Sequence, residues 1–177
     1  MESNITLSPV HSDSPFLAEL TALYERAFPA NERRPLEPLI DDETGAGEVF
    51  GIFLKTEFIG FVVLLSCKHL THILYFAVEE IRRGYGFGSQ ILRLVRELHP
   101  RNRILADVEE VIPGADNAEQ REKRIAFYLR NGYRPSEVRY RWQEENYVIL
   151  VDGGTLTQQE FHDFWAYFYH HHKGFRD

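Results

Sequence analysis

Several features that would point to other protein classes are scarce or missing in this 177-residue sequence. A single cysteine, Cys67, excludes an internal disulfide framework and a multi-cysteine zinc site. The longest uncharged apolar run, residues 58–67, has 10 residues, whereas a transmembrane helix needs roughly 20. The first residues, Met-Glu-Ser-Asn, are not a basic region followed by an apolar one, so no signal peptide is expected. We therefore expect a cytoplasmic protein with no membrane-spanning segment.

Apolar residues, in contrast, are abundant. Hydrophobic residues make up 44% of the chain and aromatic residues 14%, which is too much for a disordered protein and enough for one buried core. We find no internal repeat and no linker rich in Pro, Gly or Ser. Residues 1–177 are therefore expected to form a single domain.

The net charge of −7 is unevenly distributed along the chain. Residues 81–141 carry 13 basic and 8 acidic residues, while the flanking segments are acidic. A basic middle suggests a region that meets an anionic ligand, although several of these arginines could simply solvate helices. Because the arginines are scattered and the whole chain is acidic, we do not expect nucleic acid as a partner.

The spacing of apolar and turn residues predicts a mixed succession of helices and strands. Ser14 before Pro15 is typical of a helix N-cap, and a short helix is expected around 36–43. This order predicts an α/β fold with a mixed central β-sheet and helices on both faces. The expected helices are 15–28, about 86–99, 118–131 and 157–172, and the expected strands are 49–55, 58–68, 71–78, 103–109, 138–142 and 147–151.

The last expected helix is rich in aromatic residues. Thr157 and Glu160 have the spacing of a capping box. The stripe that follows is expected to pack in the core rather than to bind a ligand, and residues 170–172, three consecutive histidines, are expected to interact with the helix C-terminus rather than with a metal. The stripe consists of Phe161, Phe164, Trp165, Phe168 and Tyr169.

A glycine-rich segment between a strand and a helix is the most informative part of the chain. Gly84, Gly86 and Gly88 stand at every second position. Glycine permits positive φ angles and close backbone approach, and helix N-terminal amides suit a phosphate or pyrophosphate. The segment fits neither a P-loop nor a dinucleotide-binding fingerprint. A turn that merely joins strand to helix remains the alternative.

Two motifs in this order resemble the GNAT superfamily, the GCN5-related N-acetyltransferases. Residues 83–88, Arg-Gly-Tyr-Gly-Phe-Gly, match its Arg/Gln-x-x-Gly-x-Gly/Ala signature. Residues 125–133, which place Tyr128 four residues before Gly132-Tyr133, resemble a later helix of the family. The resemblance covers a core of about residues 3–151, implies a GNAT-like acyl-CoA N-acyltransferase fold, and leaves residues 157–172 as a C-terminal helical extension.

The resemblance implies acetyl-coenzyme A as co-substrate and no metal. The strand end would pair with the pantetheine arm, and the amide of Val78 would polarise the thioester carbonyl. Asn117 would contact the cofactor, but its spacing to Tyr128 is longer than usual, so Arg121 or Arg124 is an alternative. The implied strand residues are Phe76, Ala77 and Val78, and the implied pyrophosphate loop comprises Arg83, Gly84, Tyr85, Gly86, Phe87, Gly88 and Ser89.

Catalytic roles follow from the same resemblance. Tyr128 would protonate the departing thiolate, with simple packing as the alternative. Asp107 and Glu109 alternate on one strand face, so both can reach one cleft. Glu109 is the first choice and Asp107 the second for the base that takes the amine proton, unless both are paired with Arg103 or Arg121. Glu32 is expected to bind a cationic acceptor, or else to be a solvated loop charge.

The sequence therefore predicts an acetyl-coenzyme A-dependent N-acetyltransferase acting on a small-molecule or peptide amine. The alternatives are a catalytically silent coenzyme A-binding module and a transferase of a longer acyl group. The aromatic helix could contribute to a homodimer. Cys67 is expected to be buried filler, and His69 and His72, which flank an expected turn, share no zinc-ligand motif.

Overall fold

The computed structural model describes residues 4–172 and contains one seven-stranded sheet in the order β1-β2-β3-β4-β5-β7-β6. Neighbouring strands are antiparallel except β4 and β5, which are parallel. The strands are β1 (Ile5–Pro9), β2 (Gly47–Leu54), β3 (Glu57–Cys67), β4 (Leu70–Val78), β5 (Arg103–Glu109), β6 (Arg134–Trp142) and β7 (Glu145–Asp152). The helices are α1 (Leu17–Ala27), α2 (Phe87–Leu98), α3 (Ala118–Arg130) and α4 (Gln158–His171), with single 3₁₀ turns η1 (Glu37–Leu39) and η2 (Glu80–Arg82).

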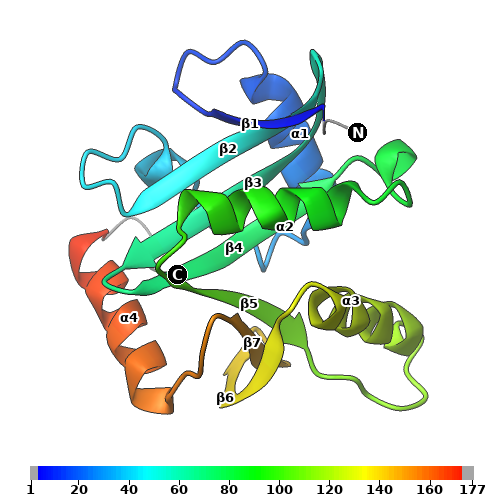
Figure 1. Cartoon of the computed structure of the whole chain (residues 1–177), viewed down its shortest axis with the longest axis vertical. Coiled ribbons are helices and arrows are strands. Elements are labelled where there is room, and N and C mark those ends of the chain that lie inside the picture. Colours follow the sequence, from blue (N-terminus) through cyan, green and yellow to red (C-terminus); the bar gives the residue numbers. More distant parts are fainter. Residues whose placement is uncertain (1–3, 173–177) are drawn as a thin grey trace.

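Helices cover both faces of the sheet, as the sequence predicts. Helices α2 and α3 lie on the face nearer the viewer in Figure 1, and their apolar residues join one core cluster. The apolar residues of α1 and α4 join the second cluster, on the opposite face. Alternation along β5 shows the two sides, because Val108 packs in the α2–α3 cluster whereas Leu105 packs in the α1–α4 cluster.

The central strands β4 and β5 separate part of the way along the sheet, and this split creates the opening described below. Strands β4 and β5 pair only from Leu70 to Ile73 on β4, opposite 103–106 on β5. The register of β4 against β3 shifts at this point, where Leu74 is left without a partner, as in a β-bulge. Beyond the bulge β4 follows β3 and β5 follows β7. The two central strands therefore diverge, and side chains from both faces reach the opening between them.

Four sequence expectations differ from the structure. Strand β1 was not anticipated, because the apolar–polar alternation of residues 5–8 is short and ends at Pro9. Ser14 does not cap α1; its hydroxyl accepts the His11 amide at 2.8 Å, and α1 begins at Leu17. The short helix expected at 36–43 is the single turn η1. Strand β6 begins at Arg134, four residues before the expected start, and Pro135 is tolerated there because β6 is an edge strand.

Helix α4 begins with the predicted capping box. The Thr157 hydroxyl accepts the Glu160 amide at 3.1 Å, and the Glu160 carboxylate accepts the Thr157 amide at 3.0 Å. At the other end, His172 contacts Asp42 at 2.9 Å, which ties α4 to the loop before β2. The buried side chains of α4 pack on its own sheet, and a homodimer stays a prediction. These side chains are Phe161, Phe164 and Phe168.

The described chain contains no helix that is long and apolar enough to cross a membrane.

Candidate active site

Two cavities meet at the split between β4 and β5. The first has a volume of about 620 Å³, and we call it the acidic–aromatic cavity. The second, of about 500 Å³, lies along the glycine-rich segment, and we call it the glycine-loop groove. Both are lined by five common residues, which therefore mark their junction. These are Ala27, Phe28, Phe76, Arg124 and Tyr128.

The glycine-loop groove contains nearly all the residues that were expected to hold the coenzyme. The two exceptions are Tyr85 and Asn117. Tyr85 is 65% exposed and stacks on Phe87 with ring centroids 5.8 Å apart. Asn117 lines the acidic–aromatic cavity and is absent from the lining of the groove. The expected residues that do line the groove are Phe76, Ala77, Val78, Arg83, Gly84, Gly86, Phe87, Gly88 and Ser89.

The local backbone geometry explains why glycine occupies positions 84, 86 and 88. Gly84 and Gly86 have φ angles of 86° and 79°, a region that other residues adopt only under strain. A Cβ atom added at either position would meet nothing within 4 Å, so the space next to this backbone is open. At Gly88 an added Cβ would lie 2.9 Å from the Phe127 ring. The third glycine therefore permits close packing of α2 on α3.

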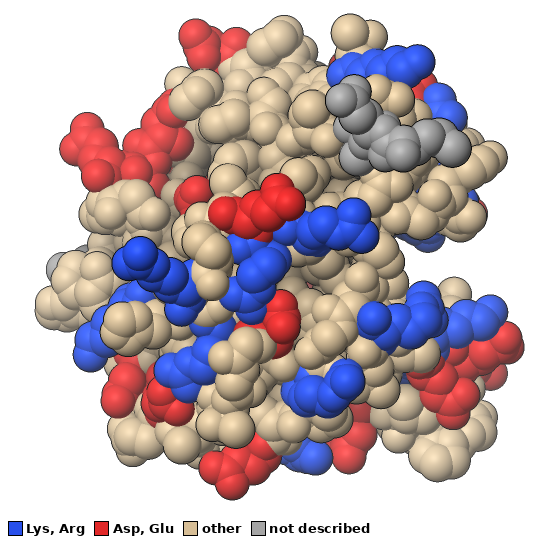
Figure 2. Space-filling view, in the orientation of Figure 1, with Lys and Arg blue, Asp and Glu red and all other residues tan. Residues whose placement is uncertain are grey.

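The groove presents backbone amides and positive charge. Gly86 is the N-cap of α2 and offers no side-chain cap, so the amides of the first turn have no partner within the helix. The charged side chains that line the groove are all arginines, although Arg82 is paired with Glu57 at 2.6 Å. Figure 2 shows a hollow at this side of the molecule, with Lys and Arg side chains on the rim formed by α3. This environment suits a multiply charged anion.

Tyr128 stands at the junction of the two cavities. It comes from α3 on one face of the sheet, yet the split lets it line the same cavity as Asp107 and Glu109 of the other face. The residue is only 2% exposed and also packs against Phe127 and Tyr133. Burial raises the pKa of its phenol, so the hydroxyl keeps its proton at neutral pH.

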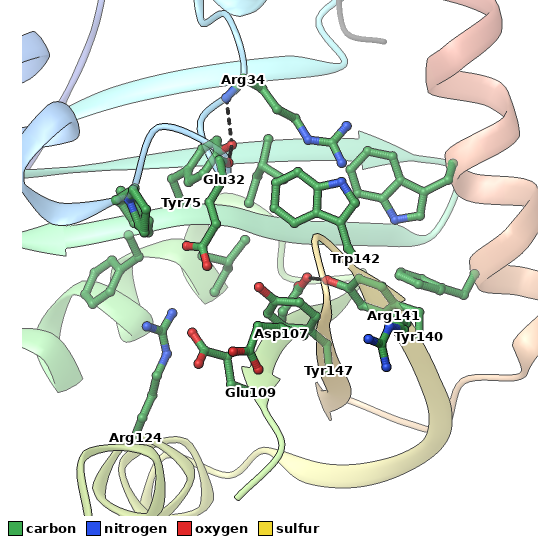
Figure 3. A pocket seen from close by; sticks show the side chains of 18 of the residues that line it. Glu32, Arg34, Tyr75, Asp107, Glu109, Arg124, Tyr140, Arg141, Trp142 and Tyr147 are labelled. Carbon is green, nitrogen blue, oxygen red and sulfur yellow. Dashed lines mark hydrogen bonds between the residues drawn. The ribbon is translucent and has the colours of Figure 1, made fainter. Parts of the chain in front are cut away.

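The acidic–aromatic cavity brings together side chains from distant parts of the sequence (Figure 3). Its floor is formed by β4, β5 and the β6–β7 hairpin, and its walls by α4, α3 and the loop after α1. Its carboxylates are Glu32, Asp107, Glu109 and Glu145, and its arginines are Arg34, Arg121, Arg124 and Arg141.

Asp107 is held by two partners. His72 contacts one carboxylate oxygen, and the Tyr140 hydroxyl donates to the other. Burial raises the pKa of Asp107, but the charge and hydrogen bond of His72 and the bond from Tyr140 outweigh it, so the pKa lies below its usual value. The expectation that His72 flanks a turn is wrong, because the residue lies inside β4 and is fully buried. Asp107 is therefore an ionised, anchored carboxylate.

Glu109 has a cationic partner. Arg121 contacts Glu109 at 2.6 Å and Glu145 at 3.1 Å, and it donates to the Glu110 carbonyl at 2.8 Å. This arrangement is one of the ion pairs weighed as an alternative to a catalytic role. Arg103, the other suggested partner, instead pairs with Glu160 at 2.6 Å.

Glu32 lies in the loop after α1 and is half-buried. Its amide donates to Pro29 at 2.9 Å, and its carbonyl accepts the Tyr75 hydroxyl at 2.7 Å, so its backbone is fixed. Figure 3 shows its carboxylate directed toward Glu109. Burial raises the pKa of Glu32, and the negative charges of Glu109 and Glu145 add to the effect. The side chain is thus a cavity group rather than a solvated loop charge.

Aromatic rings surround a third part of the cavity. The Arg34 guanidinium lies 5.0 Å from the Trp142 ring centroid and 4.9 Å from that of Trp165, and it donates to the Tyr169 hydroxyl at 3.2 Å. The aromatic stripe of α4 is therefore divided. Phe161, Phe164 and Phe168 are core residues as predicted, whereas Trp165 and Tyr169, together with one edge of the core at Phe161, line the cavity.

Sequence reasoning missed much of this cavity. Arg34, Tyr75, Tyr140 and Trp142 received no role, because no local motif contains them. The only available signal was strand alternation, which places Tyr140 and Trp142 on the same face of β6. In the described chain, no three His, Cys, Asp or Glu side chains come together in a way that could hold a metal ion. Cys67 ends β3, lines neither cavity, and has a thiol pKa that is raised by burial.

Comparison with known proteins identifies a matching family model and similar solved structures. A family model described as an acetyltransferase (GNAT) domain matches residues 46–135. A GNAT-family protein from Bacteroides thetaiotaomicron has a similar structure, with 22% identity, a TM-score of 0.74, and coverage of 97% of this chain and 99% of its own. No curated protein matches the chain.

Two further similar structures were solved with ligands. A GNAT family acetyltransferase from Elizabethkingia anophelis, with acetyl-CoA bound, is 19% identical with a TM-score of 0.56, covering 85% of this chain and 99% of its own. Naa50 from Arabidopsis thaliana, in complex with the bisubstrate analogue CoA-Ac-MVNAL, is 18% identical with a TM-score of 0.63, covering 85% and 99%. At these identities the likeness shows a shared fold.

Proposed function

Because the chain belongs to the GNAT acetyltransferase family, we propose that it is an acetyl-coenzyme A-dependent N-acetyltransferase acting on a primary amine of a small molecule or peptide. The observation that carries this proposal is the meeting of the glycine-loop groove with the acidic–aromatic cavity at Tyr128. One cavity suits an anionic coenzyme, the other suits a cationic amine, and a buried phenol lies between them.

The residues of the groove fit the coenzyme. The amides of the first turn of α2 and the open backbone at Gly84 and Gly86 would hold the pyrophosphate, with Arg83 and Arg130 nearby. The part of β4 from Phe76 to Val78 lies beyond its pairing with β5, so its free edge is available to the pantetheine arm. The similar structures with acetyl-CoA or a CoA analogue bound support this placement.

When bound, acetyl-coenzyme A supplies a thioester carbonyl carbon that an amine nitrogen attacks as the carbon–sulfur bond breaks. The backbone amide of Val78 is suited to donate to the carbonyl oxygen, where negative charge develops. Tyr128 holds a proton at its Oη and donates it to the departing sulfur. Because burial raises its pKa, the phenol is protonated at neutral pH and so carries the proton that the departing sulfur needs.

The amine must lose a proton before it attacks, since alkylamines are almost fully charged at neutral pH. Glu109 and Asp107 both line the cavity, as their alternation on β5 predicts. Their surroundings favour supporting roles, however, because Asp107 has a partner on each oxygen and Glu109 is paired with Arg121. We therefore propose that they set the charge and shape of the acceptor site.

The test combines binding and turnover. Titration calorimetry with acetyl-, succinyl- and longer acyl-coenzyme A should show tightest binding for the acetyl form. Release of free thiol should be measured with spermidine, kanamycin, 2-phenylethylamine and a five-residue peptide with a free N-terminus. Tight binding without transfer to any amine would favour a silent coenzyme-binding module, and equal use of long chains would contradict the acetyl assignment.

A further inference from the structure

The four carboxylates of the acidic–aromatic cavity differ in what balances their charge. Glu109 and Glu145 share Arg121, and Asp107 is bound by His72 and Tyr140. Glu32 forms no salt bridge with any residue in 4–172, although it is half-buried in the same cavity. A partly buried carboxylate without a salt-bridge partner is costly, unless an incoming ligand supplies a positive charge in direct contact with it.

The position of Glu32 is fixed before any ligand arrives. The Tyr75 hydroxyl donates to the Glu32 carbonyl at 2.7 Å and accepts the Arg34 amide at 3.0 Å. The Tyr24 hydroxyl accepts the same Arg34 amide at 2.8 Å. Two buried tyrosines thus hold the loop on both sides of residue 33, and Figure 3 shows the Glu32 side chain reaching from it into the cavity. Such a preorganised group is suited to orient a substrate.

We propose that Glu32 is the residue that binds the ammonium group of the acceptor and accepts its proton. This inference rests on the proposed function and specifies its acceptor as an alkylammonium, charged at neutral pH. One proton passes from the ammonium nitrogen to a Glu32 oxygen, which leaves a neutral amine and a neutral carboxyl. Glu32 then releases that proton to solvent. After the nitrogen has attacked, it loses a second proton, which balances the proton that Tyr128 gives to sulfur.

The charged groups facing Glu32 support this role. Glu109 of β5 and Glu145 of β7 repel its negative charge, whereas Arg124 of α3 and the Tyr147 side chain of β7 favour it and so lower its pKa. Burial and the two glutamates together raise the pKa of Glu32 above its usual value. A carboxylate with a raised pKa is a better proton acceptor than an anchored one with a lowered pKa, such as Asp107.

The test compares two amines of nearly equal shape. Ethylamine is an ammonium ion at neutral pH, whereas methoxyamine is uncharged and needs no proton acceptor before attack. With Glu32→Gln, kcat/KM for ethylamine should fall about a hundredfold and that for methoxyamine less than about threefold. Glu32→Asp should recover part of the ethylamine rate. Glu37→Gln, an exposed carboxylate of η1 outside both cavities, is the matched control and should change neither rate.

A second measurement does not depend on turnover. In protein with ¹³C-labelled glutamate, the carboxyl signal that is lost in Glu32→Gln should titrate above the usual range and should shift on addition of ethylammonium. Equal losses for both amines in Glu32→Gln, or a Glu32 signal that ignores ethylammonium, would overturn the inference while leaving acetyl transfer intact. Absence of transfer from wild type to every amine would instead overturn the proposed function.

Discussion

The two cavities are built in different ways. The glycine-loop groove takes six of its sixteen lining residues from one short segment, residues 83–89, whose glycines expose backbone, and its lining carries arginines but no carboxylate. The acidic–aromatic cavity is formed by side chains that range from Ala27 to Tyr169, with four carboxylates and four arginines. A backbone site depends on φ angles and helix direction, whereas a side-chain site depends on many separate contacts. A single substitution should therefore be enough to weaken ligand binding in the glycine-loop groove. In the acidic–aromatic cavity, single substitutions should each cause a partial loss.

The largest effect is expected where the two cavities meet. Tyr128→Phe removes the phenol proton but keeps the ring that packs against Phe127 and Tyr133. Loss of a general acid costs about 10²–10⁴ in rate, so kcat for the best amine of the panel should fall by that factor. Titration calorimetry should show unchanged acetyl-coenzyme A affinity. If kcat stays within threefold of wild type, Tyr128 only packs, and the junction has no chemical role.

The contact between Asp107 and the buried His72 can be used to test the acidic–aromatic cavity. Asp107→Asn should lower the free energy of unfolding by about 3–5 kcal/mol, because it leaves His72 without its anionic partner in the core. Coenzyme affinity should not change, since Asp107 is absent from the groove. The free energy of unfolding is measured by denaturant titration followed by fluorescence, and the coenzyme affinity by titration calorimetry. Equal losses of stability and coenzyme affinity would contradict the separation of the two cavities.

The same variant also tests how the free energy of unfolding depends on pH. The pKa of Asp107 is lower in the folded protein than its usual value of 3.8. The folded state therefore binds this proton less tightly than the unfolded chain does, and the stabilisation is complete above about pH 3.8. It declines as the pH falls below that value toward the folded pKa. The stability difference between wild type and Asp107→Asn should shrink in this acidic range, and a difference that grows there would refute the assignment.

A glycine substitution tests the backbone site with a matched control. Gly86→Ala and Gly45→Ala both place a Cβ on a residue with positive φ, 79° and 72°, and both open into free space. Each should lose about 1–2 kcal/mol of stability from backbone strain. Only Gly86→Ala should also weaken acetyl-coenzyme A binding, by about tenfold, because Gly86 is the N-cap of α2 and its Cβ would enter the open space of the groove. Equal affinities in the two variants would remove the main support for the pyrophosphate site.

The same contrast explains what the sequence could predict. The glycine loop, the partners of β3 and the capping box of α4 depend on residues a few positions apart, so local patterns suffice. The ion pairs of Arg121 and the contacts of Asp107 join residues that are up to 35 positions apart in the sequence. No local rule places Arg34 between two indoles from β6 and α4. Strand β1 was missed because its apolar–polar alternation covers only residues 5–8 and ends at Pro9.

The smallest effect is expected at the N-terminus of α4. Thr157→Ala removes the hydroxyl that accepts the Glu160 amide at 3.1 Å, and a lost N-cap costs about 1 kcal/mol. The carboxylate of Glu160 remains bound to Arg103 at 2.6 Å, so the helix should stay docked. Trp165 and Tyr169 line the acidic–aromatic cavity from this helix, so KM for the amine should rise about twofold while coenzyme affinity stays constant. Because α4 contributes no residue to the groove, a change in coenzyme affinity would mean that the two cavities are coupled through the sheet, and the contrast between them would fail.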